Sequence, residues 1–414
     1  MSGVALHAAG RPRFSALPPL SLYVHIPWCV RKCPYCDFNS HEARGEVPER
    51  HYVDAVIADL ERALPHVWGR KVVSVFFGGG TPSLFSAASI DALLAGIRAR
   101  LPLLADAEVT LEANPGTFER GKFAGFFAAG VTRLSLGIQS FDPRHLRALG
   151  RIHDGDEARR AAEAGMMIFA NVNLDLMFAL PGQTEADVER DVDAALSFGA
   201  PHLSFYQLTI EPNTLFHRHP PPLPDDDLAA DMQAQVAARL ASAGYGRYEV
   251  SAYARPGRGS VHNLNYWRFG DYLGLGAGAH SKLSFADRIV REVRWKHPTQ
   301  YLDRVAAGDP AIERHEVTRD DVAFEFMLNA LRLTDGVPAA LFAERTGYPL
   351  AIAARALDEG VRRGLIDADP SRIAATEIGQ RFLNQTLQLF LPASSAASAS
   401  PAIPVAITES TARR

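Results

Sequence analysis

The chain reads YVHIPWCVRKCPYCDF over residues 23–38, and this stretch decides how the rest of the sequence is interpreted. It contains Cys29, Cys33 and Cys36, the only cysteines among 414 residues. An odd, clustered set of cysteines does not form a disulfide framework. It indicates instead a metal or redox role in a reducing compartment.

The C-x3-C-x2-C spacing predicts an iron–sulfur cluster. A short loop directly after a strand can place three thiolates on one face of a cubane. Clusters usually take four cysteine ligands, so Cys29, Cys33 and Cys36 leave one iron open for another molecule. A structural zinc site with a fourth ligand from His25 or His41 is a less favoured alternative, as are three buried inert thiols.

Outward from this loop, β-rich runs alternate with amphipathic helical runs. The predicted strands are Ser21–Ile26, Val72–Phe77, Glu108–Ala113, Arg133–Ile138, Asn171–Met177 and His202–Leu208. The predicted helices are Glu49–Ala63, Ala88–Arg100, Phe118–Ala129, Asp156–Gly165 and Glu185–Phe198. This order implies parallel strands with right-handed crossovers, in an open sheet or in a barrel two units short of eight.

Composition divides the chain into five parts. We expect an N-terminal extension (1–19), a core (20–245), an aromatic and glycine-rich segment completing it (246–316), a helical domain (317–391) and a disordered tail (392–414). The acidic run Asp225–Asp227 is predicted to begin a helix. The helical domain is predicted to contain Val322–Leu333, Ala339–Arg345, Ala351–Arg363 and Thr376–Phe390. Together with a turn unit after residue 363, these helices resemble a winged helix.

Charge and hydropathy narrow the class of protein. The net charge is −4, from 43 basic and 47 acidic residues, so the basic excess of a nucleic-acid-binding protein is missing and DNA binding is disfavoured. We see no signal peptide and no run of about 20 apolar residues, which predicts a cytoplasmic protein. The sequence leaves open peripheral contact with a membrane, and it does not decide between a monomer and a homodimer.

Polar residues and glycines lie where predicted strands end. Gly78, Gly79, Gly80 and Thr81 follow the second strand, and glycines there let a ligand approach the backbone. The other polar residues at or just after strand ends are Glu112, Gln139, Arg151 and Asp175. Side chains at the carboxyl ends of barrel strands converge, so we expect one shared site.

With these motifs in this order, the sequence resembles the radical SAM superfamily, and within it the oxygen-independent coproporphyrinogen III oxidase-like family, over about residues 20–390. The resemblance implies a partial (β/α)6 barrel and a [4Fe–4S] cluster whose open iron is chelated by the methionine amino and carboxylate groups of S-adenosylmethionine (SAM). Carried over, it implies SAM contacts from Tyr23, Gly79, Gly80, Thr81, Glu112, Gln139, Arg151 and Asp175. It also places Tyr35 beside the cluster.

Two functions compete within this family: the oxidative decarboxylation of coproporphyrinogen III, and heme delivery by a chaperone. The oxidases carry a fourth cysteine where this chain has Phe38, and they have a long extension for which there is no room before Cys29. Residues 261–267 read VHNLNYW, which resembles the chaperones' heme-binding signature. His262 can offer an imidazole to heme iron, and Tyr266 and Trp267 offer flat faces. We therefore expect a chaperone that transfers heme to acceptor hemoproteins.

Two points stay open at this stage. SAM on an open iron can be cleaved reductively, so the sequence does not decide whether the protein is an enzyme. An isolated histidine beside aromatic residues is more often part of a hydrogen-bonded core than an iron ligand. For His262, heme is favoured only because the other motifs of the family are present in the same chain. The glycine-rich run Leu273–His280 lacks dinucleotide-binding spacing and is expected to pack closely near the cluster.

Overall fold

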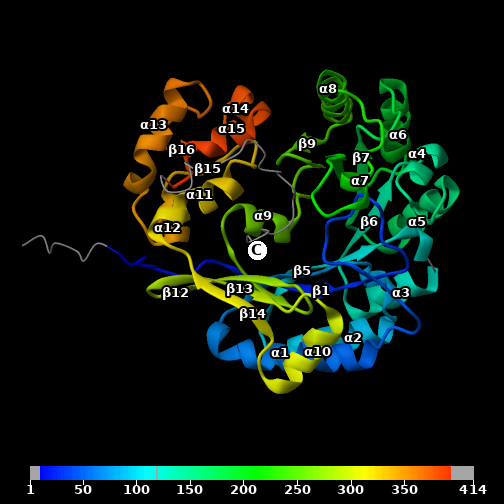
Figure 1. Cartoon of the computed structure of the whole chain (residues 1–414), viewed down its shortest axis with the longest axis horizontal. Helices are drawn as coiled ribbons and strands as arrows, with labels where there is room; N and C mark the ends of the chain where they lie inside the picture. Colours follow the sequence, from blue (N-terminus) through cyan, green and yellow to red (C-terminus); the bar gives the residue numbers. More distant parts are fainter. Residues whose placement is uncertain (1–9, 118–119, 393–414) are drawn as a thin grey trace, which may run out of the picture.

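The computed structural model describes residues 10–117 and 120–392 (Figure 1). Much of the predicted N-terminal extension and nearly all of the predicted tail therefore lie outside the described residues. None of the helices in these ranges is long and apolar enough to cross a membrane.

A single curved sheet of twelve strands organises the chain, and Figure 1 shows it wrapping around a short helix, α9 (Val261–Trp267). Its order is β14-β13-β12-β11-β1-β4-β5-β6-β7-β8-β10-β9. The six predicted strands are confirmed as a parallel set. Their bounds are β1 Leu20–Ile26, β4 Val72–Gly79, β5 Leu103–Ala113, β6 Arg133–Gln139, β7 Val172–Phe178 and β8 His202–Gln207. The α/β fold expected from the sequence is thus present.

The sheet extends beyond this set through residues 246–316, where we predicted no strands. The added strands are β9 Gly246–Arg247, β10 Ala252–Ala254, β11 Asp271–Leu275, β12 His280–Phe285, β13 Arg288–Arg294 and β14 Ala311–Glu316. β11 runs parallel to β1, and β12 to β14 continue antiparallel. In β11 a glycine interrupts the alternation, because His280 of β12 approaches too closely there for a side chain. A Cβ on Gly274 would lie 2.0 Å from the carbonyl oxygen of His280.

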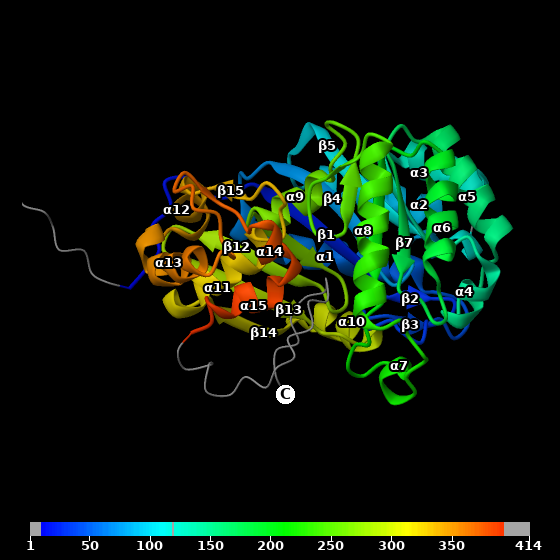
Figure 2. The same cartoon turned by 90° about the horizontal axis from the view of Figure 1, so that it is seen from above.

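Helices cover the outer face of the sheet (Figure 2), except α7, whose Phe216 N–H donates to the Pro34 carbonyl of the cysteine loop at 3.0 Å. Their bounds are α1 Glu49–Val67, α2 Ala87–Arg98, α3 Arg120–Ala129, α4 Pro143–Ala148, α5 Gly155–Ile168, α6 Glu185–Ser197, α7 Leu215–Arg218, α8 Asp226–Ser242 and α10 Pro298–Ala307. The first residues of the predicted helix Phe118–Ala129 fall outside the described residues. Helix α8 begins as predicted at the acidic run, where the Asp225 carboxylate accepts a hydrogen bond from the Leu228 N–H at 2.8 Å.

The parallel strands are apolar on one face and polar on the other. In β1, Leu22 and Val24 point outward into the main hydrophobic core beneath the helices. Ser21 and His25 alternate with them, point inward and are also buried. The same alternation places polar side chains along the inner face of every strand from β4 to β8. The inside of the curved sheet is therefore lined for binding, and the core lies between sheet and helices.

The C-terminal part is mainly helical, as predicted. Its helices are α11 Arg319–Ala330, α12 Ala340–Thr346, α13 Ala354–Arg362, α14 Glu377–Arg381 and α15 Leu383–Gln388, with the two-stranded pair β15 (Val337–Pro338) and β16 (Arg372–Ile373). It has its own hydrophobic core, to which Trp267 and Phe269 also belong.

The prediction of one helix over Thr376–Phe390 is wrong, because the chain bends between α14 and α15. Phe382 has φ −112° and ψ 45°, outside helical values. The Thr386 hydroxyl donates to the Gly379 and Phe382 carbonyls, each at 3.1 Å, and thereby partners carbonyls at the bend.

Candidate functional site

Three cysteines lie in a loop that leaves the carboxyl end of β1. Cys29 ends the short strand β2 (Trp28–Cys29), which pairs in parallel with β3 (His41–Glu42). The N–H of Cys36 donates to the Cys33 carbonyl at 3.1 Å, which closes a turn within the loop. The loop is thus pinned at both ends and folded in the middle.

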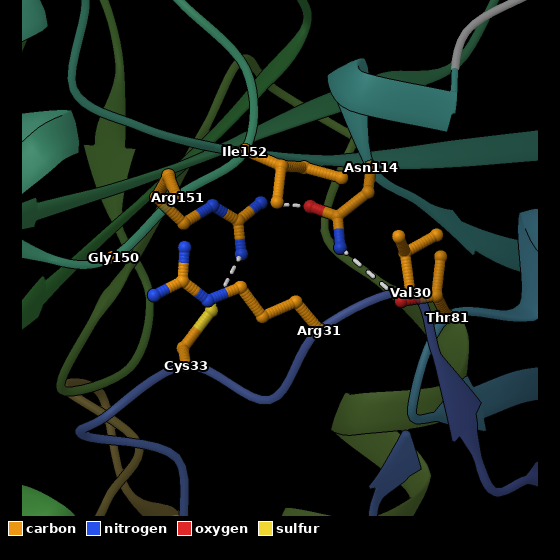
Figure 3. Close-up of a pocket in the computed structure, with 8 residues that line it drawn as sticks. All are labelled: Val30, Arg31, Cys33, Thr81, Asn114, Gly150, Arg151 and Ile152. Atoms are coloured by element: carbon orange, nitrogen blue, oxygen red, sulfur yellow. Dashed lines mark hydrogen bonds between the residues drawn. The ribbon is translucent and has the colours of Figure 1, made fainter. Parts of the chain in front are cut away.

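Each cysteine sulfur has a polar side chain beside it. The contacts are Thr81 Oγ1 to Cys29 Sγ (3.4 Å), Arg151 Nη1 to Cys33 Sγ (3.6 Å) and Ser40 Oγ to Cys36 Sγ (3.6 Å). Figure 3 shows the second of these. Donors of this kind stabilise a thiolate relative to a thiol.

Burial has the opposite effect on ionisation. It raises the pKa of Cys29, and it raises the pKa of Cys36 to about 11. Such thiols ionise only beside a compensating positive charge, which bound iron provides because metal binding and thiol ionisation are coupled. The donor set therefore suits a metal group.

The spacing of the thiols favours a cluster over a single ion. Thiolates on one tetrahedral zinc lie about 3.8 Å apart, given a Zn–S bond of about 2.3 Å. Within the described residues, the three sulfurs are not among the groups whose ligand atoms all lie within 4.8 Å of one another. Nor is His25 free to ligate: its Nε2 donates to the Asn39 carbonyl at 2.8 Å, and its Nδ1 accepts from the Tyr23 hydroxyl at 3.0 Å.

The glycine turn at the end of β4 lies against the cluster loop. The N–H of Gly80 donates to Ile26 O at 2.8 Å, and the N–H of Thr81 donates to Trp28 O at 2.7 Å. A Cβ on Gly80 would lie 2.6 Å from Trp28 O, and Gly79 has φ +114°. Only glycine permits this approach without strain.

Two partly buried acids, Glu112 and Asp175, face the inside of the sheet. Glu112 Oε2 accepts a hydrogen bond from the Gly79 N–H at 3.3 Å. Burial, and then the nearby charge of Asp175, raises the pKa of Glu112 to about 8. Burial also raises the pKa of Asp175, which accepts from Ser135 Oγ at 2.7 Å. Both carboxylates gain from a cationic ligand, and SAM carries an ammonium and a sulfonium group.

Arg151, Asn114 and Thr81 form a hydrogen-bonded chain across the mouth of the site (Figure 3). Arg151 Nη2 donates to Asn114 Oδ1 and to Gly137 O, the latter at 2.8 Å. Asn114 Nδ2 donates to Thr81 Oγ1 at 3.2 Å. Together with Cys33 these residues line a narrow pocket with a cavity volume of about 10 Å³.

Gln139 reaches the same place through a bulge. The register of β6 against β7 shifts between Gly137 and Gln139, and Gln139 has φ +68°. Its Nε2 would lie 3.0 Å from a Cβ on Gly137, a position that Asn114 and Arg151 also surround. Absence of a side chain at Gly137 thus leaves room for three polar groups to meet.

The two predicted tyrosines lie on either side of this site. Tyr23 stacks on Phe76 with ring centroids 6.2 Å apart, and its ring would lie 3.0 Å from a Cβ on Gly78. Burial raises the pKa of Tyr35, an effect that the Arg151 charge opposes, so Tyr35 lies in the cluster loop near that guanidinium. The structure therefore brings together all the predicted SAM-binding and cluster-flanking residues.

His262 lies apart from them, deeper on the inner face of the sheet. Its Nδ1 is 3.0 Å from Ser74 Oγ, and its ring centroid is 4.9 Å from that of Phe76. Ser74 precedes Gly79 by five residues in β4, which corresponds to roughly 16 Å along a strand. Burial lowers the pKa of His262 to about 3, so the imidazole is neutral.

Tyr266 and Trp267 are packed into protein. Trp267 is buried in the C-terminal core, and the Arg332 guanidinium covers its ring at 4.4 Å. The rings of Tyr266 and Tyr272 lie 4.8 Å apart. In this conformation, neither aromatic residue presents a free face beside His262.

Two residues of the site went unassigned from sequence. Asn114 links Arg151 to Thr81, and His25 lies against Gly79, where a Cβ would come within 2.6 Å of its ring. The signal was present for both: Asn114 follows a predicted strand end, and His25 alternates with apolar residues in the first strand. His280 is partly buried, and burial lowers its pKa to about 4.

Comparison with known proteins shows which family the chain belongs to. The model of the radical SAM superfamily matches residues 23–195, and that of the HemN C-terminal domain matches residues 317–382. Heme chaperone HemW of Escherichia coli is 48% identical over 377 residues, which cover 91% of this chain and 99% of that protein. The HemW of Haemophilus influenzae is 46% identical and is covered to 98%.

Among solved structures, coproporphyrinogen III oxidase (HemN) from Escherichia coli, described as a radical SAM enzyme, superposes with a TM-score of 0.78. It is 25% identical, and the match covers 90% of each chain. The shared architecture thus includes both the curved sheet and the C-terminal helical part.

Proposed function

Because the chain belongs to the HemW family within the radical SAM superfamily, we propose that it is a heme chaperone that binds heme and transfers it to acceptor hemoproteins. The observation that carries this proposal is the 48% identity to a HemW that is covered over 99% of its length. Phe38, at the position of the oxidases' fourth cysteine, supports the same choice. We place this activity in the cytoplasm and assign it no nucleic-acid partner.

We further propose that Cys29, Cys33 and Cys36 hold the [4Fe–4S] cluster that the superfamily implies. When bound, the cluster would offer an open iron that the methionyl group of SAM can chelate. The chain contributes the surroundings of that iron: Thr81, Arg151 and Ser40 donate toward the sulfurs. The predicted SAM contacts are those that converge beside the glycine turn.

Replacing any one of the three cysteines by serine should abolish the cluster, because a hydroxyl is a poor substitute for a thiolate ligand of iron. Iron and sulfide analysis of the reconstituted protein measures this, against about four irons per chain in an intact cubane. Ser40→Ala is the matched control and should keep its iron, because Ser40 only neighbours a sulfur. A full iron content in Cys33→Ser would refute the ligand set.

For heme, we propose His262 as the iron ligand. The Ser74 hydroxyl donates to Ser21 Oγ at 2.8 Å, so it accepts from the His262 Nδ1–H. This tautomer leaves the Nε2 lone pair available, the form in which imidazole binds metals. Access requires α9 to shift, because His262 is 8% exposed.

His262→Ala should weaken heme binding at least tenfold while the cluster and SAM affinity persist. Titration of heme into reconstituted protein, followed by its absorption band, gives the affinity. His51→Ala, at an exposed position on α1, is the control for loss of a histidine. Equal heme affinity in His262→Ala and wild type would remove His262 from the assignment.

An anaerobic turnover assay separates the chaperone from the oxidase. Reconstituted protein receives SAM, a reductant and coproporphyrinogen III, with a known oxidase run in parallel. We expect no protoporphyrinogen by chromatography when the control enzyme is active. Clear turnover would make the chain an oxidase and Phe38 an unimportant difference.

A further inference from the structure

Arg133 begins strand β6 and points to the inner face of the sheet, where it is 2% exposed. No described residue accepts a hydrogen bond from its guanidinium, and its Nε is fully buried. The nearest acid is Glu108, whose Oε2 lies 3.9 Å from Nε, beyond hydrogen-bonding distance. A buried guanidinium with five donors and no acceptor is costly unless something else binds it.

Unlike Arg133, the other two buried arginines among the described residues make ion pairs at hydrogen-bonding distance. Arg294 contacts Asp59 at 2.9 Å, and Arg332 contacts Glu249 at 3.1 Å. A residue next to Arg133, Thr110, also lacks a hydrogen-bond partner within the described part of the chain. Thr110 pairs with Arg133 in the register of β5 and β6, and its hydroxyl is buried without a hydrogen-bond partner among the described residues. The Arg133 guanidinium and the Thr110 hydroxyl are thus neighbours on the inner face, and neither has a hydrogen-bond partner among the described residues.

The acid nearest to Arg133 is already engaged elsewhere. Glu108 Oε1 accepts from the Ser260 hydroxyl at 3.2 Å and from the His262 N–H at 3.1 Å. It therefore holds the first turn of α9, which carries the proposed heme ligand. Through Glu108, Arg133 and His262 lie on opposite sides of one carboxylate.

We propose that Arg133, assisted by Thr110, binds a carboxylate of the tetrapyrrole inside the curved sheet, an inference that rests on the proposed heme-binding function. A propionate matches the guanidinium fork and supplies the missing acceptor. Its macrocycle then lies within reach of His262. The bound carboxylate selects for tetrapyrroles with free acid groups.

SAM is a second source of a carboxylate, and position argues against it. Arg133 is the first residue of β6, whereas Gln139, a predicted SAM contact, is the last. Six residues of strand separate them by about 20 Å. The SAM carboxylate is expected on the open iron beside the cysteine loop, at the Gln139 end of the sheet. Glu112, a predicted SAM contact whose register partner is Ser135, lies closer to Arg133, so the SAM affinity of the Arg133 variants is measured as well.

The test compares ligands as well as variants. Reconstituted full-length protein with SAM is titrated with heme, heme dimethyl ester and metal-free protoporphyrin, in wild type, Arg133→Gln and Arg133→Lys. Wild type should bind heme about tenfold or more tightly than the diester. Arg133→Gln should remove that difference, and Arg133→Lys should keep part of it. SAM affinity should stay within about twofold in all three.

Each outcome decides between the proposals. A wild type that binds acid and ester equally, or an Arg133→Gln variant that still separates them, overturns the role of Arg133 even if heme binds. Metal-free protoporphyrin that binds in an Arg133-dependent way, with no gain from iron, keeps this inference and sinks iron ligation by His262. Loss of SAM affinity alone would assign Arg133 to SAM. Absence of binding by any tetrapyrrole overturns both proposals.

Discussion

At the scale of single residues, the inner face of the sheet gathers acids whose ionisation is opposed by burial. Glu112 is the clearest case, since its pKa is raised to about 8. Near neutral pH and without a cation nearby, it holds a proton. A ligand that brings positive charge beside Gly79 and Glu112 reverses this, which links SAM binding to proton release.

This residue predicts a pH dependence of stability in the SAM-free protein. Between pH 4.5 and about 8, folded Glu112 keeps a proton that the unfolded chain has released. The free energy of unfolding therefore falls as pH rises through this window, by up to ~4 kcal/mol. Glu112→Gln removes this contribution, so the variant should gain stability relative to wild type at pH 8.5 compared with pH 5.

Urea unfolding followed by circular dichroism at the two pH values measures the effect. Glu163→Gln, which changes an exposed acid on α5, should leave the pH dependence of wild type intact. A Glu112→Gln variant whose stability relative to wild type is the same at both pH values would show that Glu112 ionises normally. The same variant should also bind SAM more weakly, because a neutral amide attracts a cation less.

At the scale of elements, the site depends on how the end of β4 packs on the loop after β1. Gly80 makes this contact through its backbone. A Cβ added at Gly80 would lie only 2.6 Å from the Trp28 carbonyl oxygen. Because Trp28 directly precedes Cys29, a displacement of the turn moves a proposed cluster ligand. The end of β4 and the loop after β1 are therefore in contact at the proposed cluster site.

Gly80→Ala should consequently lower iron incorporation and SAM affinity, each by severalfold or more. The alanine Cβ and the Trp28 carbonyl oxygen would be 2.6 Å apart, so the turn and the loop must separate. Iron analysis after reconstitution and equilibrium dialysis with SAM test this. Gly121→Ala in α3 is the control, since a Cβ there meets nothing within 4 Å. It should be neutral or slightly stabilising, as alanine favours helix. Normal iron and SAM binding in Gly80→Ala would mean that the turn adapts freely.

At the scale of the whole molecule, α9 and the segment before it join the sheet to the C-terminal helices. Trp267 and Phe269 belong to the C-terminal core, while His262 of the same helix lies against β4. A buried ion pair reinforces this junction: Glu249, between β9 and β10, accepts from Arg332 at 3.1 Å. A shift of α9 on heme binding at His262 would thus affect both the curved sheet and the C-terminal helical part.

Breaking that pair should destabilise the whole protein. Arg332→Met leaves Glu249 buried and unpaired, which should cost about 3 kcal/mol or more in free energy of unfolding. Adding Glu249→Gln to it should recover part of the loss, because no charge then remains buried. Arg239→Met, which breaks an exposed pair with Asp193, should cost under about 1 kcal/mol. Urea unfolding of the three variants and wild type would contradict this if Arg332→Met and Arg239→Met cost the same.

The sequence by itself determined the order of the parallel strands and where the polar residues of the site fall along them. Alternation of apolar residues is a local property, and Cys29, Cys33 and Cys36 lie within one loop, so neighbours in the chain suffice to read both. The residues at strand ends converge because parallel strands end at the same edge. Glu112 and Gln139, at the ends of β5 and β6, could therefore be grouped before any coordinates were known. The expectation that Arg151 and Asp175 also lie at strand ends is wrong, because Arg151 follows helix α4 and Asp175 lies in the middle of β7.

Tertiary structure alone decided what lies beside what across long distances in the chain. Strands β11 to β14 join the sheet through pairing with distant segments, and in β11 the close approach of His280 to Gly274 interrupts the alternation that would reveal a strand. Arg133 and Thr110 lack partners only because β5 and β6 turn both inward, and His262 meets Ser74 across 188 residues. The bend at Phe382 likewise depends on contacts made after folding. Such contacts carry no local pattern, since packing selects them from many sequence-compatible alternatives.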